Sequence, residues 1–144
     1  MPPVASLGLG ASVGYIAPML TPFFAQRFAD SWYSAWNSHE SERIMAHYAS
    51  HVEHSSPYLL RYSITDARSI TGRDNLRVFY ERVLEINNFM RLEPLHVAVG
   101  FDSVVLVYRG ISNDLAAEVF FFDSSGKVVR SAANYGLWHA NAPV

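Results

Sequence analysis

The stretch AAEVFFFDSSGKVVRSAANYG, residues 116–136, predicts two β-strands joined by a tight turn at DSSG. Alternate residues of a strand share a face, so one side of the first strand carries Ala116, Glu118, Phe120 and Phe122. The other side carries Ala117, Val119, Phe121 and Asp123. Both sides are largely apolar, which predicts that both are covered. Glu118 stands out, because a buried carboxylate without a partner is costly and usually becomes neutral through a raised pKa.

Two further strand patterns precede this pair. After Asn88 the spacing of apolar residues changes from the helical period to alternation. The stretches LEPLHVAV, SVVLVYRG, LAAEVFFF and KVVRSAANYG are separated only by the short turns GFDS, ISND and DSSG. Short turns between successive strands predict an antiparallel meander.

Helical patterns fill most of the chain before the meander. Thr21 and Pro22 form a helix start, and an apolar stripe follows at spacing four: Phe24, Phe28, Trp32 and Trp36. NSHES, residues 37–41, ends this helix and begins a shorter one that carries Ile44, Met45 and Tyr48. HVEHSSPY predicts a strand ended by Pro57, residues 58–71 predict a loop, and residues 73–88 predict the clearest helix. Helices first and a meander last predict an α+β fold.

Composition limits the classes of partner. The chain has 144 residues, 50% hydrophobic and 17% charged, with a net charge of −2 and no basic run, so nucleic acid is not expected as a partner. The absence of cysteine excludes disulfides and cysteine-ligated zinc and fits a reducing, cytoplasmic location. No stretch is apolar and long enough to cross a membrane. We expect an N-terminal arm over residues 1–20 and a single domain over residues 21–144.

Four stretches, in this order, resemble one known family: FADSWYSAWNSHESERIMAHYAS, VEHSSP, ITGRDNLRVFYERVL and AAEVFFFDSSGKVVRSAANYG. Together they resemble the SnoaL-like branch of the nuclear transport factor 2-like superfamily. The resemblance implies a strongly curved antiparallel sheet wrapped around helices as a cone, which encloses a mostly apolar pocket for a small organic molecule. It also implies a homodimer through the outer face of the sheet.

Ketosteroid isomerases share this fold, and their C-terminal hairpin is similar to the one in this chain. The resemblance places Glu118 where the isomerase keeps a protonated carboxylic acid that donates a hydrogen bond to the enolate oxygen. It places Trp32 at the oxyanion-hole tyrosine and Ser56 at the general base. A serine alone cannot take a proton from carbon near neutral pH, so steroid isomerisation by that route is not expected.

Polyketide cyclases of the SnoaL type often carry a histidine in the strand that resembles VEHSSP, and His54 matches that position. His54 has the strand parity of Val52 and Ser56, so it faces the cavity if Ser56 does. We expect His54 and Glu118 to form the catalytic pair, with His54 as base and Glu118 as hydrogen-bond donor or orienting group. The alternative is a satisfied polar pair with a structural role. The Asp-Arg-Asp network of epoxide hydrolases with this fold is not found.

Other residues are expected to shape the pocket rather than to react. They are Trp32, Ser56, Phe120, Ser131 and Tyr135, which supply aromatic walls or hydroxyl groups, although each also fits plain packing. His47, His51 and His54 would align as metal ligands only on one continuous helix, which is expected to stop near Ser50, so no metal site is predicted.

Two functions remain open from the sequence. The first is an isomerase, dehydratase or cyclase that transfers protons without a metal or nucleotide cofactor. The second is a protein that binds a small ligand, or acts by association, without catalysis. The carboxyl at Glu118 favours the enzyme, and the lack of a general base at Ser56 favours the binding protein.

Overall fold

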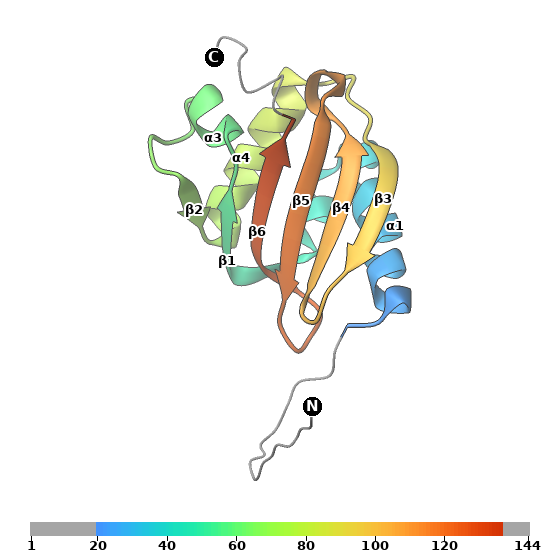
Figure 1. Cartoon of the computed structure of the whole chain (residues 1–144). Coiled ribbons are helices and arrows are strands. Elements are labelled where there is room, and N and C mark those ends of the chain that lie inside the picture. Colours follow the sequence, from blue (N-terminus) through green and yellow to red (C-terminus); the bar gives the residue numbers. More distant parts are fainter. Residues whose placement is uncertain (1–19, 137–144) are drawn as a thin grey trace.

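A single mixed sheet with helices on one of its faces forms the molecule (Figure 1). The computed structural model describes residues 20–136. The predicted arm over residues 1–20 therefore lies outside the described residues apart from Leu20. The elements in chain order are α1 (Pro22–Ser38), α2 (Ser41–Met45), β1 (Tyr48–Ser55), α3 (Tyr58–Arg61), β2 (Ser69–Thr71), α4 (Arg73–Ile86), β3 (Glu93–Val99), β4 (Ser103–Arg109), the 3₁₀ turn η1 (Ile111–Asn113), β5 (Leu115–Phe122) and β6 (Val128–Tyr135).

The sheet has the strand order β2-β1-β6-β5-β4-β3 and is curved (Figure 1). The pairs β3–β4, β4–β5 and β5–β6 are antiparallel and form the predicted meander. The pair β1–β6 is parallel, because the chain crosses from one side of the meander to the other between these strands. The sheet is therefore mixed rather than purely antiparallel as predicted.

Helix α1 begins where the sequence predicts. The Thr21 hydroxyl accepts a hydrogen bond from the Phe24 amide at 3.0 Å. Pro22 occupies the first turn, where backbone N–H groups have no partner within the helix, so the missing N–H of proline costs no hydrogen bond. The helix ends at His39, which adopts a left-handed conformation with φ 60°. α1 packs near β3 and α4 packs near β1, so the two long helices cover the same face of the sheet.

The segment between β1 and α4 differs from the prediction. Residues 58–71 contain the four-residue helix α3 and the three-residue strand β2, where the sequence predicts only a loop. Tyr48, predicted in the short helix, is the first residue of β1, because α2 ends at Met45. Elements this short show too few repeats for a period to be recognised.

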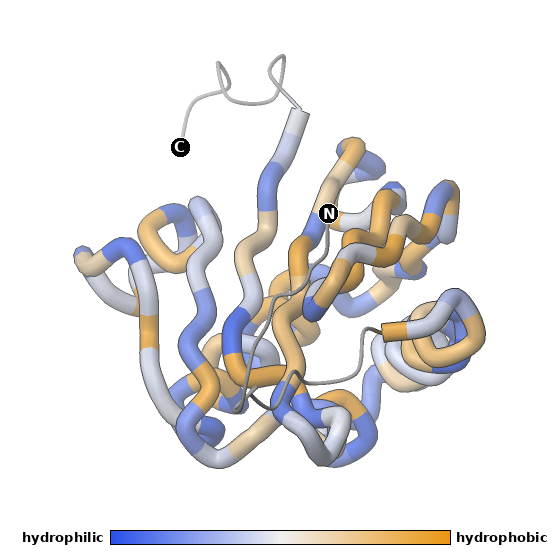
Figure 2. Tube along the Cα trace, turned by 60° about the horizontal axis from the view of Figure 1, so that its bottom comes forward, coloured by the Kyte–Doolittle hydropathy of each residue, from blue (hydrophilic) through white to orange (hydrophobic). Residues whose placement is uncertain are grey.

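The core lies between the sheet and the helices, and the alternation of the strands decides which residues enter it. Ala116, Glu118 and Phe120 are buried, whereas Ala117 and Val119 are only half-buried. Hydrophobic residues recur along both the strands and the helices, with hydrophilic residues between them (Figure 2). In residues 20–136, no helix has both the length and the apolar character that crossing a membrane requires.

Candidate functional site

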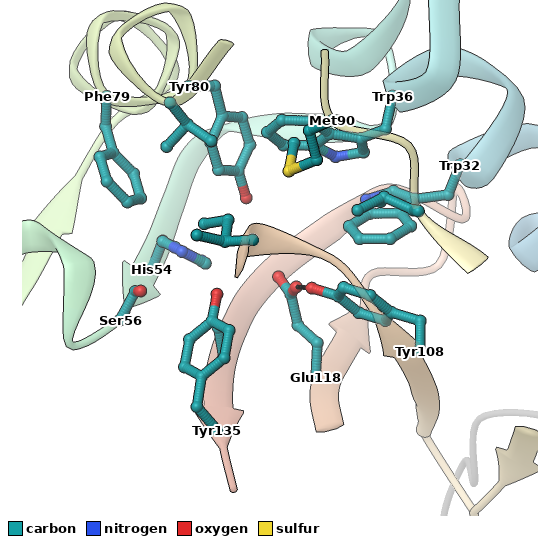
Figure 3. Close-up of a pocket in the computed structure, with 14 residues that line it drawn as sticks. Trp32, Trp36, His54, Ser56, Phe79, Tyr80, Met90, Tyr108, Glu118 and Tyr135 are labelled. Atoms are coloured by element: carbon teal, nitrogen blue, oxygen red, sulfur yellow. Dashed lines mark hydrogen bonds between the residues drawn. The ribbon is translucent and has the colours of Figure 1, made fainter. Parts of the chain in front are cut away.

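A cavity lies inside the fold, between the concave side of the sheet and helices α1 and α4 (Figure 3). Its volume of about 40 Å³ is far below the roughly 300–1,000 Å³ of pockets for drug-sized ligands. Aromatic and apolar side chains dominate the lining, which consists of Trp32, Trp36, His54, Ser56, Phe79, Tyr80, Val83, Met90, Leu92, Tyr108, Ile111, Glu118, Ala133 and Tyr135. The cavity is therefore small and mostly apolar, with the carboxyl of Glu118 among its few polar groups.

Glu118 projects from the middle of β5 into this cavity and is 3% exposed. The Tyr108 hydroxyl donates a hydrogen bond of 2.7 Å to its Oε1 atom (Figure 3). Burial raises the pKa of Glu118 to about 7 from its ordinary value of 4.5, and the Tyr108 hydrogen bond lowers it by a smaller amount. Both protonation states of this carboxyl are therefore populated near neutral pH, which suits a group that accepts and returns a proton.

His54 projects from β1 into the same cavity and is 2% exposed. Its Nδ1 atom shares a hydrogen bond of 2.7 Å with the Ser131 hydroxyl on β6. Burial lowers the pKa of His54 to about 3, so its imidazole is neutral at physiological pH. A neutral imidazole offers one donor nitrogen and one acceptor nitrogen, and the bond to Ser131 leaves Nε2 available.

Glu118 and His54 line one cavity but do not contact each other directly. β6 lies between their strands, and the register pairs His54 with Ser131 and Glu118 with Ala133. No hydrogen bond joins the two side chains in the described part of the chain. A ligand between them would therefore be needed for the two groups to act together, as the predicted catalytic pair requires.

Three of the predicted pocket residues line the cavity: Trp32, Ser56 and Tyr135. The Trp32 indole nitrogen already donates to the Tyr48 hydroxyl at 3.0 Å, so Trp32 offers only its ring as a wall. The Ser56 hydroxyl accepts from the Tyr58 amide at 3.1 Å and also bonds the Tyr135 hydroxyl. Ser56 is thus part of a local network rather than a free nucleophile or base.

Phe120 and Ser131, also predicted to shape the pocket, lie outside its lining. Both point inward, but Phe120 fills the core, with its ring centroid 4.9 Å from that of Phe28 and 5.2 Å from that of Trp32. Ser131 is covered by His54, to which it is hydrogen-bonded. Strand parity gives the side to which a residue points, but the depth of the cavity depends on packing by the helices.

Sequence reasoning missed four lining residues with polar or polarisable groups: Tyr108, Tyr80, Trp36 and Met90. Tyr108 follows Val104 and Leu106 in the alternation of β4, and register opposes it to Ala116 beside Glu118, so parity could have found it. Tyr80 and Trp36 lie on the apolar stripes of their helices. Nothing in those stripes separates a core aromatic from one that borders a cavity.

The three histidines considered as metal ligands are separated by the fold. His47 precedes β1 and its Nε2 atom lies 2.9 Å from the Ser31 hydroxyl oxygen, whereas His51 is exposed on β1 and His54 is buried. Among residues 20–136 there is no group of three or more His, Asp or Glu side chains that could hold a metal ion.

A family model described as a SnoaL-like domain matches residues 29–132. The crystal structure of a SnoaL-like protein of unknown function from Burkholderia thailandensis is 33% identical in sequence, with a TM-score of 0.78. That similarity covers 83% of this chain and 98% of the other. Among proteins with curated functions, none matches this chain.

More distant structures share the fold alone. SalBIII, described as an epoxide hydrolase/cyclase-like enzyme in pyran ring formation in the polyether salinomycin, is 15% identical with a TM-score of 0.61, covering 79% of this chain and 92% of its own. A putative isomerase of the SnoaL-like family from Agrobacterium tumefaciens is 13% identical with a TM-score of 0.64, covering 79% of this chain and 98% of its own.

Proposed function

This chain belongs to the family of SnoaL-like domains, and we propose that it is an enzyme that transfers a proton within a small ketone-type substrate. The carrying observation is Glu118, a buried carboxyl that lines the cavity and whose pKa is raised by burial to about 7. A general base works best when its pKa lies near the working pH. The distant relatives described as isomerase and cyclase-like agree with this class of reaction.

Glu118 is the proton-transfer group in this proposal. Its carboxylate removes a proton from the carbon next to a carbonyl, and the electrons of the C–H bond move into an enolate. In a β,γ-unsaturated ketone this enolate is conjugated with the C=C bond, and the protonated Glu118 returns the proton at the γ-carbon while the double bond moves to the α,β position, so the isomerisation needs no other reagent. Tyr108 fixes the carboxyl through its 2.7 Å hydrogen bond and stabilises the ionised form.

His54 is assigned a supporting role that differs from the base predicted from the sequence. Its pKa of about 3 makes it too weak a base for removing a proton from carbon. As a neutral imidazole held by Ser131, it can hydrogen-bond a polar group of the substrate through Nε2. The roles of Glu118 and His54 are therefore reversed with respect to the sequence prediction.

Exchange of substrate hydrogens with solvent deuterium tests the proposed proton-transfer activity. Cyclopentanone, a small cyclic ketone, is incubated with the full chain in D₂O, and loss of its α-hydrogens is followed by proton NMR. We expect exchange above the buffer rate, and Glu118→Gln should lower it by about 10²–10⁴-fold. Glu53→Gln, an exposed glutamate on β1, is the matched control and should keep the rate.

The second candidate is non-catalytic binding of a small ligand. The Ser56 hydroxyl favours it, because this side chain already accepts a hydrogen bond from the Tyr58 amide and cannot act as a general base. Cyclopentanone that binds without enhanced exchange would support this candidate and contradict the enzyme. Absence of both binding and exchange would contradict both. Native mass spectrometry of the purified protein would identify any small molecule that stays bound.

A further inference from the structure

A chain of hydrogen bonds links three aromatic side chains on the helical side of the cavity. The Trp32 indole nitrogen donates to the Tyr48 oxygen at 3.0 Å, and the Tyr48 and Tyr80 oxygens lie 3.1 Å apart. All three side chains are buried. An indole N–H can only donate, so the Tyr48 oxygen is an acceptor in the first of these bonds.

The direction of the second bond follows from the proton of Tyr48. The only acceptor for it among the described residues is the Tyr80 oxygen. If Tyr80 donated instead, the Tyr48 proton would stay buried without an acceptor, which is unfavourable. The favoured order is therefore Trp32 to Tyr48 to Tyr80, and it makes the Tyr80 oxygen an acceptor.

Tyr80 consequently has its own proton left to donate. Its side chain lines the cavity, and Figure 3 shows its hydroxyl directed into the space above Glu118 and Tyr135. Within residues 20–136, its one hydrogen-bond partner is Tyr48. The remaining O–H therefore points to where a ligand would lie.

Trp36 supplies a second donor on the same side. It is 5% exposed, lines the cavity, and its Nε1 atom is buried without a hydrogen-bond partner in the described residues. Its ring packs on Tyr80 with centroids 4.7 Å apart, which keeps the two groups adjacent. Figure 3 shows the Trp36 nitrogen on the side of the ring that faces the cavity. A buried indole N–H without an acceptor is costly, so a ligand acceptor would relieve the cost.

We infer that the Tyr80 hydroxyl and the Trp36 indole N–H form a donor wall that binds the carbonyl oxygen of the ligand. This inference rests on the proposed function, because it orients the ketone whose α-carbon faces Glu118. Two neutral donors also suit the enolate, since hydrogen bonds to a developing negative charge are stronger than those to a neutral carbonyl. The ligand class is thus a small ketone with its oxygen toward the helices and its α-carbon toward β5.

Two probes of matched shape test the donor wall: cyclopentanone and methylenecyclopentane, in which a CH₂ group replaces the oxygen. Binding to the ¹⁵N-labelled full chain is followed through the indole N–H resonances of its three tryptophans, with Trp36→Phe identifying the Trp36 signal. Cyclopentanone should move the Trp36 signal downfield, and methylenecyclopentane should not. The dissociation constant of methylenecyclopentane divided by that of cyclopentanone should fall about tenfold in Tyr80→Phe and in Trp36→Phe, because each variant loses a donor to the ketone oxygen.

Tyr33→Phe is the matched control, because the Tyr33 hydroxyl is also buried without a hydrogen-bond partner but does not line the cavity. It should leave the ratio unchanged. Equal ratios in the wild type and both wall variants, with an unmoved Trp36 signal, would overturn the donor wall. In that case Glu118-dependent deuterium exchange would still decide the proposed function. If Trp36→Phe fails to fold, the ratio measured for Tyr80→Phe against that for Tyr33→Phe gives the same decision.

Discussion

At the scale of single residues, Glu118 and His54 act in opposite directions on the pH dependence of stability. The pKa of Glu118 is about 7 in the folded chain against 4.5 ordinarily, so its contribution is present below pH 4.5 and lost as pH rises to 7. The pKa of His54 is about 3 against 6.5, so its contribution is present above pH 6.5 and lost as pH falls to 3. The two contributions partly cancel between pH 4.5 and 6.5.

Glu118→Gln should expose the contribution of the carboxyl, because glutamine resembles the protonated acid and does not titrate. The stability of the variant relative to the wild type should rise by about 3 kcal/mol between pH 5 and pH 8, as the wild type loses the stabilising proton. Urea denaturation at several pH values measures this difference, and the effect of His54 is common to both proteins. A difference that stays constant with pH would contradict a buried, titrating Glu118.

The position of Glu118 was predictable from the sequence, and its surroundings were not. Alternation along residues 116–122 is enough to place Glu118 on the inner face of its strand. Its partner Tyr108 and the donors on Trp36 and Tyr80 depend on register and on the rotation of two helices. Those features arise from packing over long sequence separations, which local periodicity does not encode.

At the scale of elements, the junction between β1 and β6 joins the meander to the rest of the sheet. It is the parallel pair of the sheet, and its register shifts between Tyr48 and Glu53. The Ser131 hydroxyl bonds His54 directly across this pair at 2.7 Å. The cross-strand bond thus both holds the junction and orients the imidazole in the cavity.

Ser131→Ala should destabilise this junction. The variant leaves the buried His54 Nδ1 atom without its partner, which costs about 1–3 kcal/mol of unfolding free energy. Ser50→Ala, at an exposed position of β1, is the control and should change stability by less than about 0.5 kcal/mol. Denaturant titrations of both variants compare the two costs, and equal costs would show that the bond to His54 adds nothing to stability.

Helices and strands long enough to repeat their pattern of apolar residues were predicted from the sequence, and shorter elements were not. The long helices α1 and α4 and the four strands of the meander show several turns or alternations each. The helix α3 has four residues and the strand β2 has three, so neither completes a pattern. The parallel pairing of β1 with β6 was also missed, because strand order at a crossover is a property of the whole chain.

At the scale of the molecule, the sheet has one covered face and one open face. The helices cover the concave face, whereas central residues of the opposite face are only half-buried: Val105, Val107, Ala117, Val119 and Phe121. Register places Val105 beside Val119 and Val119 beside Ala132, so the open face is continuous across β4, β5 and β6. A continuous row of apolar side chains in the middle of a sheet is unfavourable when it is exposed to water.

We propose that two copies of the chain associate through this open face as a homodimer, and Val119→Lys should separate them. In a twofold dimer each substitution occurs twice, and a lysine buried among valines has no partner there, so dimer affinity should fall more than about 100-fold. Sedimentation at micromolar concentration should show a dimer for the wild type and a monomer for Val119→Lys. Val78→Lys, at a position of α4 that is 60% exposed, adds the same charge and should leave the dimer intact. A wild-type monomer, or a Val119→Lys dimer, would contradict this association.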